Sequence, residues 1–332
     1  MCKKFRFYLL SIVALVFVFS LVPLGTIEAK EKLTAIDFVL DYTPNTNHTG
    51  IYVAQAKGYF KEQGLKVSII QPPEDGAPAL VASGKAKFGI DYQDTLAPAF
   101  ALKKALPVTA IASLVQHNTS GIISLKDNPV QRPKNMEGKA YATWGLPIEQ
   151  AIVKNVVAKD GGDPKKVKFL PEASANIYNM SKSDYDCVWV FYAWDVMSAK
   201  ANHIDYQYFA FRDINDTFDY YTPVIIGNNS YMKQHPKETK KFLAAVKKGY
   251  EYAIAHPKEA ADILLKAAPE LDKETVYKSQ DYLKDQYIAD AKRWGEFDKD
   301  RWNRFYEWLA KEKLIDRKIP KDFGFSNAYL PE

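Results

Sequence analysis

The chain has 332 residues, of which 47% are hydrophobic and 14% aromatic. That is enough apolar material for the cores of two ordinary domains, and it excludes a disordered protein. The 45 Lys and Arg exceed the 40 Asp and Glu by only five. Without residues 1–29, which hold Lys3, Lys4, Arg6 and Glu28, the numbers fall to 42 and 39. So small a surplus gives no sign of a nucleic-acid-binding surface, and we expect no nucleic-acid partner.

Residues 1–29 have the layout of an export signal. A basic head precedes an apolar run from Tyr8 to Leu24, and a polar stretch with small residues follows it. Because the run is just short of the ~20 residues of a transmembrane helix, an uncleaved membrane anchor is the alternative. In both cases we expect the folded part to lie outside the cytoplasmic membrane, in the periplasm or on the extracellular face.

The cysteines and histidines indicate neither a disulfide nor a metal site. Cys2 belongs to the basic head, and Cys187 lies in "YDCVWVF", where we expect a small buried strand residue. The five histidines show no metal-ligand spacing. The sequence also has no glycine-rich phosphate loop, and no arrangement of Ser, His and Asp suggests a catalytic nucleophile. We therefore predict no metal, no cofactor and no catalytic residues.

Short apolar runs alternate with helical patterns along the chain after the signal. The first expected strands cover residues 33–40, 65–72 and 87–92, and the first expected helices cover 49–60, 77–86 and 94–106. The pattern continues through 108–115, 119–127, 139–144, 148–161, 166–172, 186–191 and 206–211. Such alternation predicts an α/β fold with mostly parallel sheets. After residue 235 the pattern is nearly all helical, with Pro236, Pro257 and Pro269 as expected helix starts.

Two strand-like runs beside Pro, Gly or Asn, at residues 121–129 and 220–229, bracket a stretch with an α/β pattern of its own. We interpret them as crossings between two lobes, that is, as a two-strand hinge. The predicted organisation is listed here in chain order: a signal segment (1–29), a split first lobe with a helical tail (30–124 and 223–332), and an inserted second lobe (125–222).

Polar and aromatic residues gather in four loops that follow expected strands. In open α/β sheets ligands lie beyond the carboxyl ends of the strands. The four loops read "DYTPNTNH", "DYQDT", "TWGLPIEQ" and "FYAWD", and two of them come from each lobe. We therefore expect them to face one cleft. The candidate ligand-binding residues are Tyr42, Asn45, Asn47, His48, Asp91, Gln93, Asp94, Trp144, Gly145, Tyr192, Trp194 and Asp195.

Structural roles compete with ligand binding at several of these positions. Asp91 and Asp94 are equally interpreted as caps of the helix that follows, and His48 as a capping or packing residue. Tyr192 and Trp194 alternate with one residue between them, so both are able to point the same way, and at least one is as well placed for packing between the lobes. We expect the strand residue Trp189 and the tail residues to be core residues. The tail residues are Trp294, Trp302 and Trp308.

Several segments resemble a known family. The exported, two-lobed pattern resembles the solute-binding proteins of ABC importers, and "KGYFKEQGLKVSI" with "LVASGKAKFGI" is similar to their nitrate, sulfonate and pyrimidine-binding branch. More narrowly, "LDYTPNTNHTGIYVAQAKGYF", "YATWGLPIEQA" and "VFYAWD" resemble the formylaminopyrimidine-binding proteins of thiamin-precursor salvage. The resemblance implies a type II periplasmic-binding-protein-like fold. It also implies an aminopyrimidine ligand, N-formyl-4-amino-5-aminomethyl-2-methylpyrimidine or a close relative, and an ABC permease as the membrane partner.

In that family aromatic residues sandwich the pyrimidine, and a carboxylate after the Tyr-x-Trp segment contacts it. By this resemblance the carboxylate is Asp195, where the family pattern leads us to expect Glu. The residues by themselves agree with such a ligand, because an ionised carboxylate accepts hydrogen bonds from an exocyclic amine and a protonated ring nitrogen. The four loops carry no Arg or Lys. They therefore favour a neutral or cationic heterocycle over a sulfonate or nitrate.

Two alternatives stay open. The family has an enzymatic relative in fungi, a pyrimidine synthase that holds pyridoxal phosphate on a Lys, gives up an active-site His and carries a run of Cys. The corresponding stretch here, "FGIDYQDTLAP", offers neither Lys nor His, and "YYTPVIIGNN" has no Cys. These departures weigh against an enzyme. The second alternative is a binding protein for another flat heterocycle, such as riboflavin.

Overall fold

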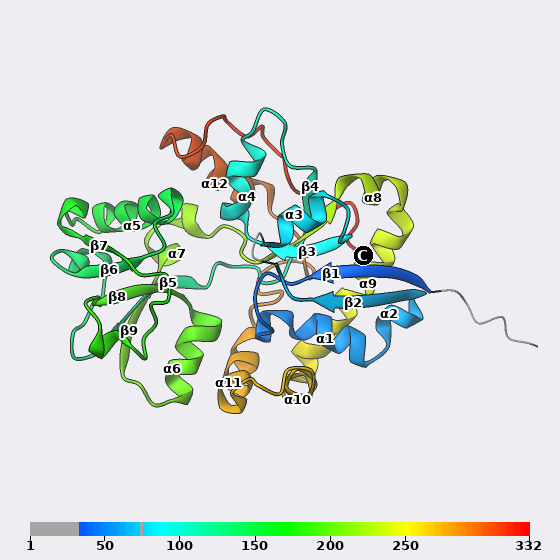
Figure 1. Cartoon of the computed structure of the whole chain (residues 1–332), viewed down its shortest axis with the longest axis horizontal. Helices are drawn as coiled ribbons and strands as arrows, with labels where there is room; N and C mark the ends of the chain where they lie inside the picture. The colour runs from blue at the N-terminus through cyan, green and yellow to red at the C-terminus, as the bar shows by residue number, and fades with distance from the viewer. Residues whose placement is uncertain (1–32, 74–75) are drawn as a thin grey trace, which may run out of the picture. The chain divides into compact units, whose positions relative to one another are not determined.

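The computed structural model of the chain describes residues 33–73 and 76–332, so the predicted export signal lies outside the described residues. Two five-stranded sheets form the framework (Figure 1). In spatial order, the first sheet comprises β2 (Leu65–Ile70), β1 (Thr34–Val39), β3 (Phe88–Asp91), β10 (Val224–Asn228) and β4 (Val108–Ser113). The second comprises β7 (Lys168–Pro171), β6 (Ala140–Thr143), β8 (Cys187–Phe191), β5 (Ser120–Leu125) and β9 (Tyr206–Ala210). Among the described helices, none is long and apolar enough to cross a membrane.

In each sheet four of the five strands run in the same direction, in agreement with the prediction, and one strand runs opposite to its two neighbours. In the first, β2 and β3 run parallel to β1, whereas β10 is antiparallel to β3 and to β4. In the second, β6 runs parallel to β7 and β8, whereas β5 is antiparallel to β8 and to β9. The loops after β1, β3, β6 and β8 therefore leave the carboxyl ends of parallel strands, where α/β proteins bind ligands.

The chain passes between the sheets twice, at residues 114–119 and 211–223. The two runs interpreted from sequence as crossings contain β5 and β10, and each connection lies immediately before its strand. Both strands are inner strands that pair on two sides, and their residues are buried except Leu125 at one end. By its pairing β5 belongs wholly to the second sheet, so the first crossing lies ahead of residue 124.

Helices cover both faces of each sheet. The bounds of the helices are α1 (Thr49–Ala56), α2 (Tyr59–Glu62), α3 (Gly76–Ala82), α4 (Gln93–Phe100), α5 (Pro147–Lys159), α6 (Met197–Ala201), α7 (Phe211–Ile214), α8 (Asn229–Gln234), α9 (Pro236–Ala255), α10 (Pro257–Ala267), α11 (Lys273–Leu283) and α12 (Lys299–Lys311). Short 3-10 turns are η1 (Thr46–His48), η2 (Pro133–Met136), η3 (Pro164–Lys166), η4 (Met180–Lys182) and η6 (Asp216–Phe218), and η5 (Tyr192–Val196) is a single π-helical turn.

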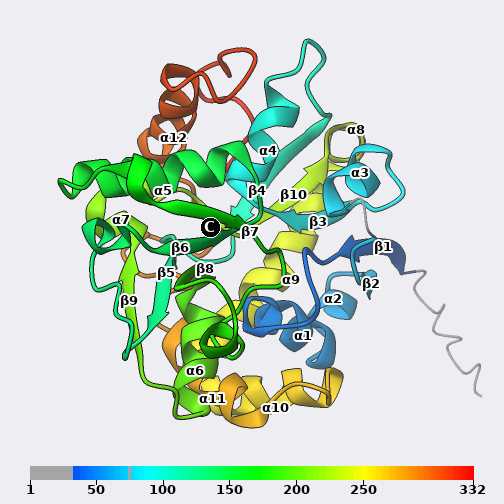
Figure 2. The ribbon, with the colours of Figure 1, turned by 60° about the vertical axis from the view of Figure 1, so that its left-hand side comes forward.

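The alternation of strand side chains divides the core into layers. In β1, Val39 packs into the cluster that includes α3 and α4, and its neighbour Phe38 packs into the cluster formed with α1 and α9. In β8, Trp189 joins the layer under α5 and α7, and Val188 joins the layer on the α6 side (Figure 2). Cys187 is buried in β8, as expected from its sequence context.

Helix α1, which follows the first candidate loop, packs unusually closely on α9. A Cβ added at Gly249 of α9 would lie 2.0 Å from the carbonyl oxygen of Gly50 in α1, and one at Gly50 would lie 2.4 Å from the Tyr250 ring. Only glycine permits this approach at the two positions. The Tyr250 hydroxyl then donates to the carbonyl oxygen of Asn47 at 2.6 Å, which ties η1 to α9.

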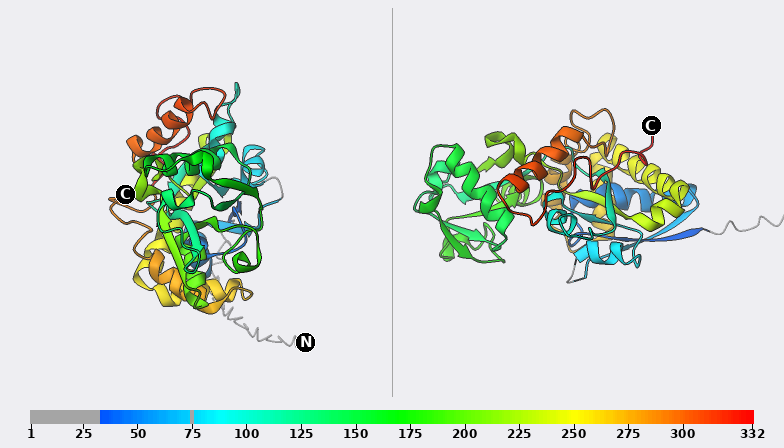
Figure 3. Two further views of the ribbon diagram at one scale, coloured as in Figure 1. Left: turned by 90° about the vertical axis from the view of Figure 1, so that its left-hand side faces the viewer. Right: turned by 90° about the horizontal axis from the view of Figure 1, so that it is seen from above.

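The helical tail does not stay with one sheet. Helix α11 packs against α10 and η1 and also against α6 and η5, which follow β8 of the second sheet. The segment after α12 then returns to the first sheet, where Ala110 of β4 exchanges hydrogen bonds with Gly324 and Ser326 (Figure 3). Pro236 and Pro257 begin helices as predicted, but Pro269 does not. Helix α11 begins after Asp272, whose side chain accepts from the Thr275 backbone N–H at 2.8 Å.

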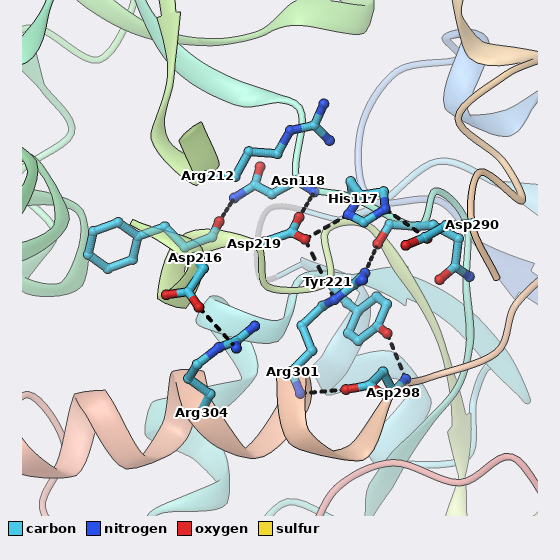
Figure 4. Close-up of polar contacts among 12 residues, drawn as sticks. His117, Asn118, Arg212, Asp216, Asp219, Tyr221, Asp290, Asp298, Arg301 and Arg304 are labelled. Atoms are coloured by element: carbon cyan, nitrogen blue, oxygen red, sulfur yellow. Dashed lines mark hydrogen bonds and ion pairs between the residues drawn. The ribbon is translucent and has the colours of Figure 1, made fainter. Parts of the chain in front are cut away.

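A charged network joins the two crossings to the tail (Figure 4). His117 of the first crossing places Nδ1 2.6 Å from Asp219 of the second, and Nε2 2.9 Å from Asp290. Carboxylates only accept, so both ring nitrogens donate and the imidazole is in its charged form. Arg301 of α12 donates to the carbonyl oxygen of Gln116 and lies 3.6 Å from Asp219. The hydrogen bond to Asp219 raises the pKa of His117 against the opposing effect of burial.

This network predicts a pH-dependent contribution to stability. Because the folded pKa of His117 is raised, the contribution is complete below the unfolded pKa of about 6.5 and is lost as the pH rises through the folded value. His117→Gln should lower the free energy of unfolding by at most about 1 kcal/mol at a pH near 6, and by less near pH 9. Urea unfolding of both proteins checks this, with the exposed His256→Gln as control. If wild type and His117→Gln differ in their free energy of unfolding by the same amount at both pH values, the prediction is contradicted.

Candidate ligand-binding site

The loop after β1 is organised around Asp41, whose side chain is 4% exposed. His48 Nε2 lies 2.7 Å from Asp41 Oδ1, and the Tyr92 hydroxyl donates to Asp41 Oδ2. His48 Nδ1 accepts from the backbone N–H of Asn45 at 3.2 Å. The nitrogen that faces Asp41 therefore carries the proton, and a neutral His48 donates to an ionised Asp41.

Burial by itself raises the pKa of Asp41, but the interactions with His48 and Tyr92 bring that pKa below its usual value. A fully buried His48 thus holds a carboxylate at the edge of the first sheet. Sequence reasoning passed over Asp41. The available signal was its place as the first polar residue after β1, ahead of the residues that were chosen.

The other candidates in this loop have different surroundings. The Asn45 side chain accepts from the Asn47 backbone N–H at 2.9 Å and caps η1. Asn47 is partly buried, and Tyr42 is 63% exposed. Tyr42 is thus available at the surface, whereas Asn45 and His48 shape the turn that presents Asp41.

The loop after β3 places two acidic groups near one another. Asp91 is 7% exposed: its Oδ1 accepts from the Thr95 hydroxyl at 2.8 Å, and its buried Oδ2 has no partner among the described residues. Burial raises the pKa of Asp91 to about 7 and that of Asp94 to about 6. Both carboxyls therefore titrate close to neutral pH.

Gln93 in the same loop is fully buried. Its amide nitrogen donates to the carbonyl oxygen of Trp302 at 2.9 Å, and its amide oxygen accepts from the Tyr221 backbone N–H at 2.9 Å. Both ends of the side chain are thus engaged, one with α12 and one with the second crossing. This contact fixes the start of α4 between the sheet and the tail.

The "TWGLP" loop after β6 exposes an aromatic face. Trp144 is 41% exposed and its ring lies 5.8 Å from that of Trp189. Gly145 has φ of 79°, a left-handed conformation that favours glycine. Its N–H donates to the Thr143 hydroxyl oxygen at 2.9 Å. The turn therefore holds Trp144 at the end of β6, with its ring tilted by 48° against that of Trp189.

Glu149, a residue that sequence reasoning did not choose, holds this loop in place. Its carboxylate is 4% exposed and accepts four hydrogen bonds. The donors are the Tyr141 hydroxyl (2.5 Å), the Thr143 hydroxyl (2.9 Å) and the backbone N–H groups of Trp144 and Leu146 (3.2 Å each). The signal for it was a Glu at the third position of a helix, where capping boxes place an acceptor.

The η5 turn after β8 sends its side chains in different directions. The Tyr192 ring lies 5.1 Å from that of Tyr208 and 4.9 Å from that of Tyr282, whereas Trp194 packs into the cluster around Tyr52, α10 and α11. A π-helical turn does not alternate like a strand, so the two side chains need not point the same way. Asp195 Oδ2 accepts from the Phe191 backbone N–H at 2.8 Å, and burial raises the pKa of Asp195 to about 6.

Two contacts bring the walls of the candidate site together. The Tyr92 ring, which also holds Asp41, lies 6.3 Å from the Phe191 ring at an interplanar angle of 21°. Deeper in the molecule, Ser279 Oγ of α11 donates to the carbonyl oxygen of Ala193 in η5. Having one proton, Ser279 accepts from Thr46 Oγ1 of η1 at 2.5 Å. The loops after β1, β3 and β8 therefore meet.

The fold defined by these two sheets and the double crossing is the α/β periplasmic-binding-protein fold that the sequence predicted. The alkanesulfonate-binding protein SsuA of Xanthomonas axonopodis pv. citri, solved bound to MOPS, matches 89% of this chain and 99% of its own with a TM-score of 0.66. The sequence identity is 10%, so this likeness concerns the fold alone.

The family follows from the sequence. The model of the family described as "NMT1/THI5 like" matches residues 45–260, and the chain belongs to this family. It is 26% identical over 334 residues to the formylaminopyrimidine-binding protein of Halalkalibacterium halodurans, covering 97% of this chain and 98% of that one. It is 28% identical over 317 residues to a 4-amino-5-hydroxymethyl-2-methylpyrimidine phosphate synthase of Saccharomyces cerevisiae, covering 89% and 87%.

Glu149→Gln tests the placement of the Trp144 loop. An amide turns a nitrogen toward groups that all donate, so at least one buried hydrogen bond is lost and a donor faces a donor. We expect a loss of about 1–3 kcal/mol in the free energy of unfolding, measured by urea denaturation. The exposed Glu307→Gln on α12 is the control. Equal stability of wild type and Glu149→Gln would mean that Glu149 does not hold the loop.

Proposed function

We propose that the protein is the extracytoplasmic solute-binding component of an ABC importer. Its ligand is an aminopyrimidine thiamin precursor, N-formyl-4-amino-5-aminomethyl-2-methylpyrimidine or a close relative, which it delivers to a membrane permease for thiamin salvage. The support is the similarity to a formylaminopyrimidine-binding protein along nearly the whole of both chains, on a fold shared with an alkanesulfonate-binding protein. The export signal expected in residues 1–29 agrees with this location.

The choice of ligand rests on the hydrogen bonding and the raised pKa of the Asp195 carboxyl. Its Oδ2 accepts from the Phe191 backbone N–H, while its Oδ1 accepts from no side chain of the described residues. A carboxyl with a pKa of about 6, held by backbone N–H groups and by no other described side chain, is suited to a ring that offers an amine and a ring nitrogen side by side. We propose Asp195 as the group that recognises this edge of the pyrimidine.

Aromatic rings at the ends of the same strands suit a flat ligand. Trp144 offers an exposed face after β6, and the pair of Tyr92 and Phe191 lies where the two walls meet. Asp41, held ionised by His48, gives the first wall a fixed acceptor. We propose that the ring binds beyond the ends of β1, β3, β6 and β8, with Trp144 as a stacking face. Tyr192 and Trp194 contribute by packing the wall behind it.

The similarity to the yeast synthase keeps one enzymatic alternative worth testing. Such an enzyme holds pyridoxal phosphate through a lysine, and residues 88–98, in β3 and α4, contain none. The nearby Lys87 Nζ donates to the carbonyl oxygen of Gly84 at 2.8 Å. We therefore propose a binding protein. Incubation with pyridoxal phosphate should give no internal aldimine absorbance band, and a clear band would favour the synthase.

Trp144→Ala tests the stacking face. Removing a partly exposed indole should leave the fold intact and weaken the binding of formylaminopyrimidine by about 1–3 kcal/mol, because the ring loses both a stacking partner and buried area. Isothermal titration calorimetry measures the change. Tyr178→Ala removes another exposed aromatic residue of the second-sheet half and serves as the control. Unchanged affinity in Trp144→Ala would move the ligand away from the β6 loop.

Asp195→Asn tests the recognition of the ring edge. The change keeps the shape of the side chain but removes a charge-assisted contact worth about 1.5–3 kcal/mol, so affinity near pH 6 should fall by about one to two powers of ten. The exposed Asp184→Asn is the control. Wild-type affinity in this variant would remove Asp195 from the site.

The same calorimetric titrations, repeated at several pH values, test whether the ring and Asp195 share a proton. If the ring and Asp195 share one proton in the complex, neither free partner carries it at pH values above both of their pKa values. Binding there takes up a proton, and the wild-type affinity should fall about tenfold per pH unit. Asp195→Asn should lack this slope. Weaker binding of the variant with no slope in the wild type would keep the hydrogen bond and discard the shared proton.

A further inference from the structure

A cavity of about 210 Å³ lies beside the η5 turn. Its walls come from both parts of the chain: Tyr208 from β9, Tyr192 from η5, Tyr282 from α11, and Asn118 and Arg212 from the two crossings. It is smaller than the ~300–1,000 Å³ usual for drug-sized ligands. An occupant of this cavity is therefore restricted to about one ring with a small substituent.

The walls are mainly aromatic faces. The ring of Tyr192 stands 5.1 Å from that of Tyr208 and 4.9 Å from that of Tyr282, tilted by 60° and 49°. Two of the hydroxyls are engaged: Tyr208 donates to the carbonyl oxygen of Thr119 at 2.9 Å, and Tyr192 accepts from Lys200 at 2.8 Å. What these residues offer an occupant is ring surface, which favours a flat apolar body.

Arg212 and Asp213 are the two charged residues that line the cavity, and Arg212 has unused donors. Among the polar contacts of the described residues, its only partner is Asp213, whose Oδ1 lies 3.8 Å from Nε and whose side chain is 73% exposed. The arginines nearby differ. Arg301 donates to the carbonyl oxygen of Gln116, and Arg304 lies 3.2 Å from Asp216. Figure 4 shows the Arg212 guanidinium turned away from the network that joins these groups.

The guanidinium is also close enough to the tyrosines to act on their charge. Burial raises the pKa of Tyr208 and of Tyr282; in both, the positive charge of Arg212 opposes that rise and the negative charge of Asp213 adds to it. The 28% exposed side chain thus lies among the rings and not in bulk solvent. With Asp213 on the Nε side, the two terminal amino groups remain for an occupant. A planar fork of this kind pairs with a carboxylate through two parallel hydrogen bonds.

We propose that this cavity is a second ligand site, distinct from the aminopyrimidine site, and that it takes a small aromatic carboxylate. The carboxylate pairs with the terminal amino groups of Arg212, and the ring lies among Tyr192, Tyr208 and Tyr282. The chemistry is opposite to that of the aminopyrimidine site, where carboxylates meet a neutral or cationic ring. The two sites therefore select ligands of different charge.

The probes are benzoate and benzamide, which share shape and differ in charge. Calorimetric titration of the full chain should show binding of benzoate, also after saturation with formylaminopyrimidine, and little or no binding of benzamide. Arg212→Gln should weaken benzoate about ten- to a hundredfold, and the control Arg304→Gln should not. Asp213→Asn should strengthen benzoate severalfold, because it removes a negative charge next to the bound carboxylate.

Each of the following outcomes would overturn the proposal: no binding of benzoate, equal binding of benzamide, an unchanged affinity in Arg212→Gln, or displacement of benzoate by formylaminopyrimidine. Thermal unfolding of Arg212→Gln checks that the variant is folded. If it is not, the benzoate and benzamide titrations with Asp213→Asn still decide, because weaker benzoate binding in Asp213→Asn contradicts an anion site. If the wild-type protein does not bind formylaminopyrimidine, the proposed function is contradicted, but the benzoate result still tests the second site.

Discussion

The hydroxyl of Ser279 is the link on which the geometry of the candidate site depends. It is fully buried, donates to Ala193 of η5 and accepts from Thr46 of η1, so one atom joins the loop after β1 to the turn after β8. A hydroxyl has a single proton, and a buried one gains stability only when its partners are correctly placed. Because Ser279 lies on α11, the helical tail sets the position of both walls.

The tail also explains what the η5 turn does. A π-helical turn fits one extra residue into the helix that follows β8 and is frequent at functional sites. Here it turns Tyr192 toward Tyr208 and Trp194 toward α10 and α11, while Asp195 accepts from the Phe191 backbone N–H at the end of β8. A regular α-helical turn would point these three side chains in other directions. The turn has less regular hydrogen bonding than an α-helix, and the packing of α11 against η5 and α6 stabilises it.

Much of the fold was predictable from sequence because its signals are local. Strand β1 was expected at residues 33–40 and spans Thr34–Val39, and the alternation of strand and helix gave mostly parallel sheets. The position of the crossings was less predictable, since central strands such as β5 are as apolar as a connecting strand. Pro269 failed as a helix start because the cap at Asp272 decides where α11 begins.

The site was predictable only down to its loops. That "DYTPNTNH" and "FYAWD" follow strands is visible in the sequence, but the partners of their side chains lie far along the chain. Gln93 illustrates this, because its amide bonds to Trp302 and Tyr221. Glu149 and Asp41 went unnoticed for the same reason: each matters through the donors that fold around it. Composition of a loop therefore indicates which chemistry is present, and tertiary contacts decide which residue presents it.

The electrostatics of the molecule separate its two candidate sites. The loops after β1, β3, β6 and β8 contain carboxylates and no Lys or Arg, and burial brings the pKa values of Asp91, Asp94 and Asp195 close to neutral. These groups are costly to ionise in an empty site and become cheaper to ionise beside a cationic ring. Asp41 differs, because His48 and Tyr92 keep it ionised without a ligand. Asp41 is thus charged in advance, while Asp91, Asp94 and Asp195 would gain their charge only beside a bound cation. The proposed site would therefore favour a ring able to carry a proton over one that is not.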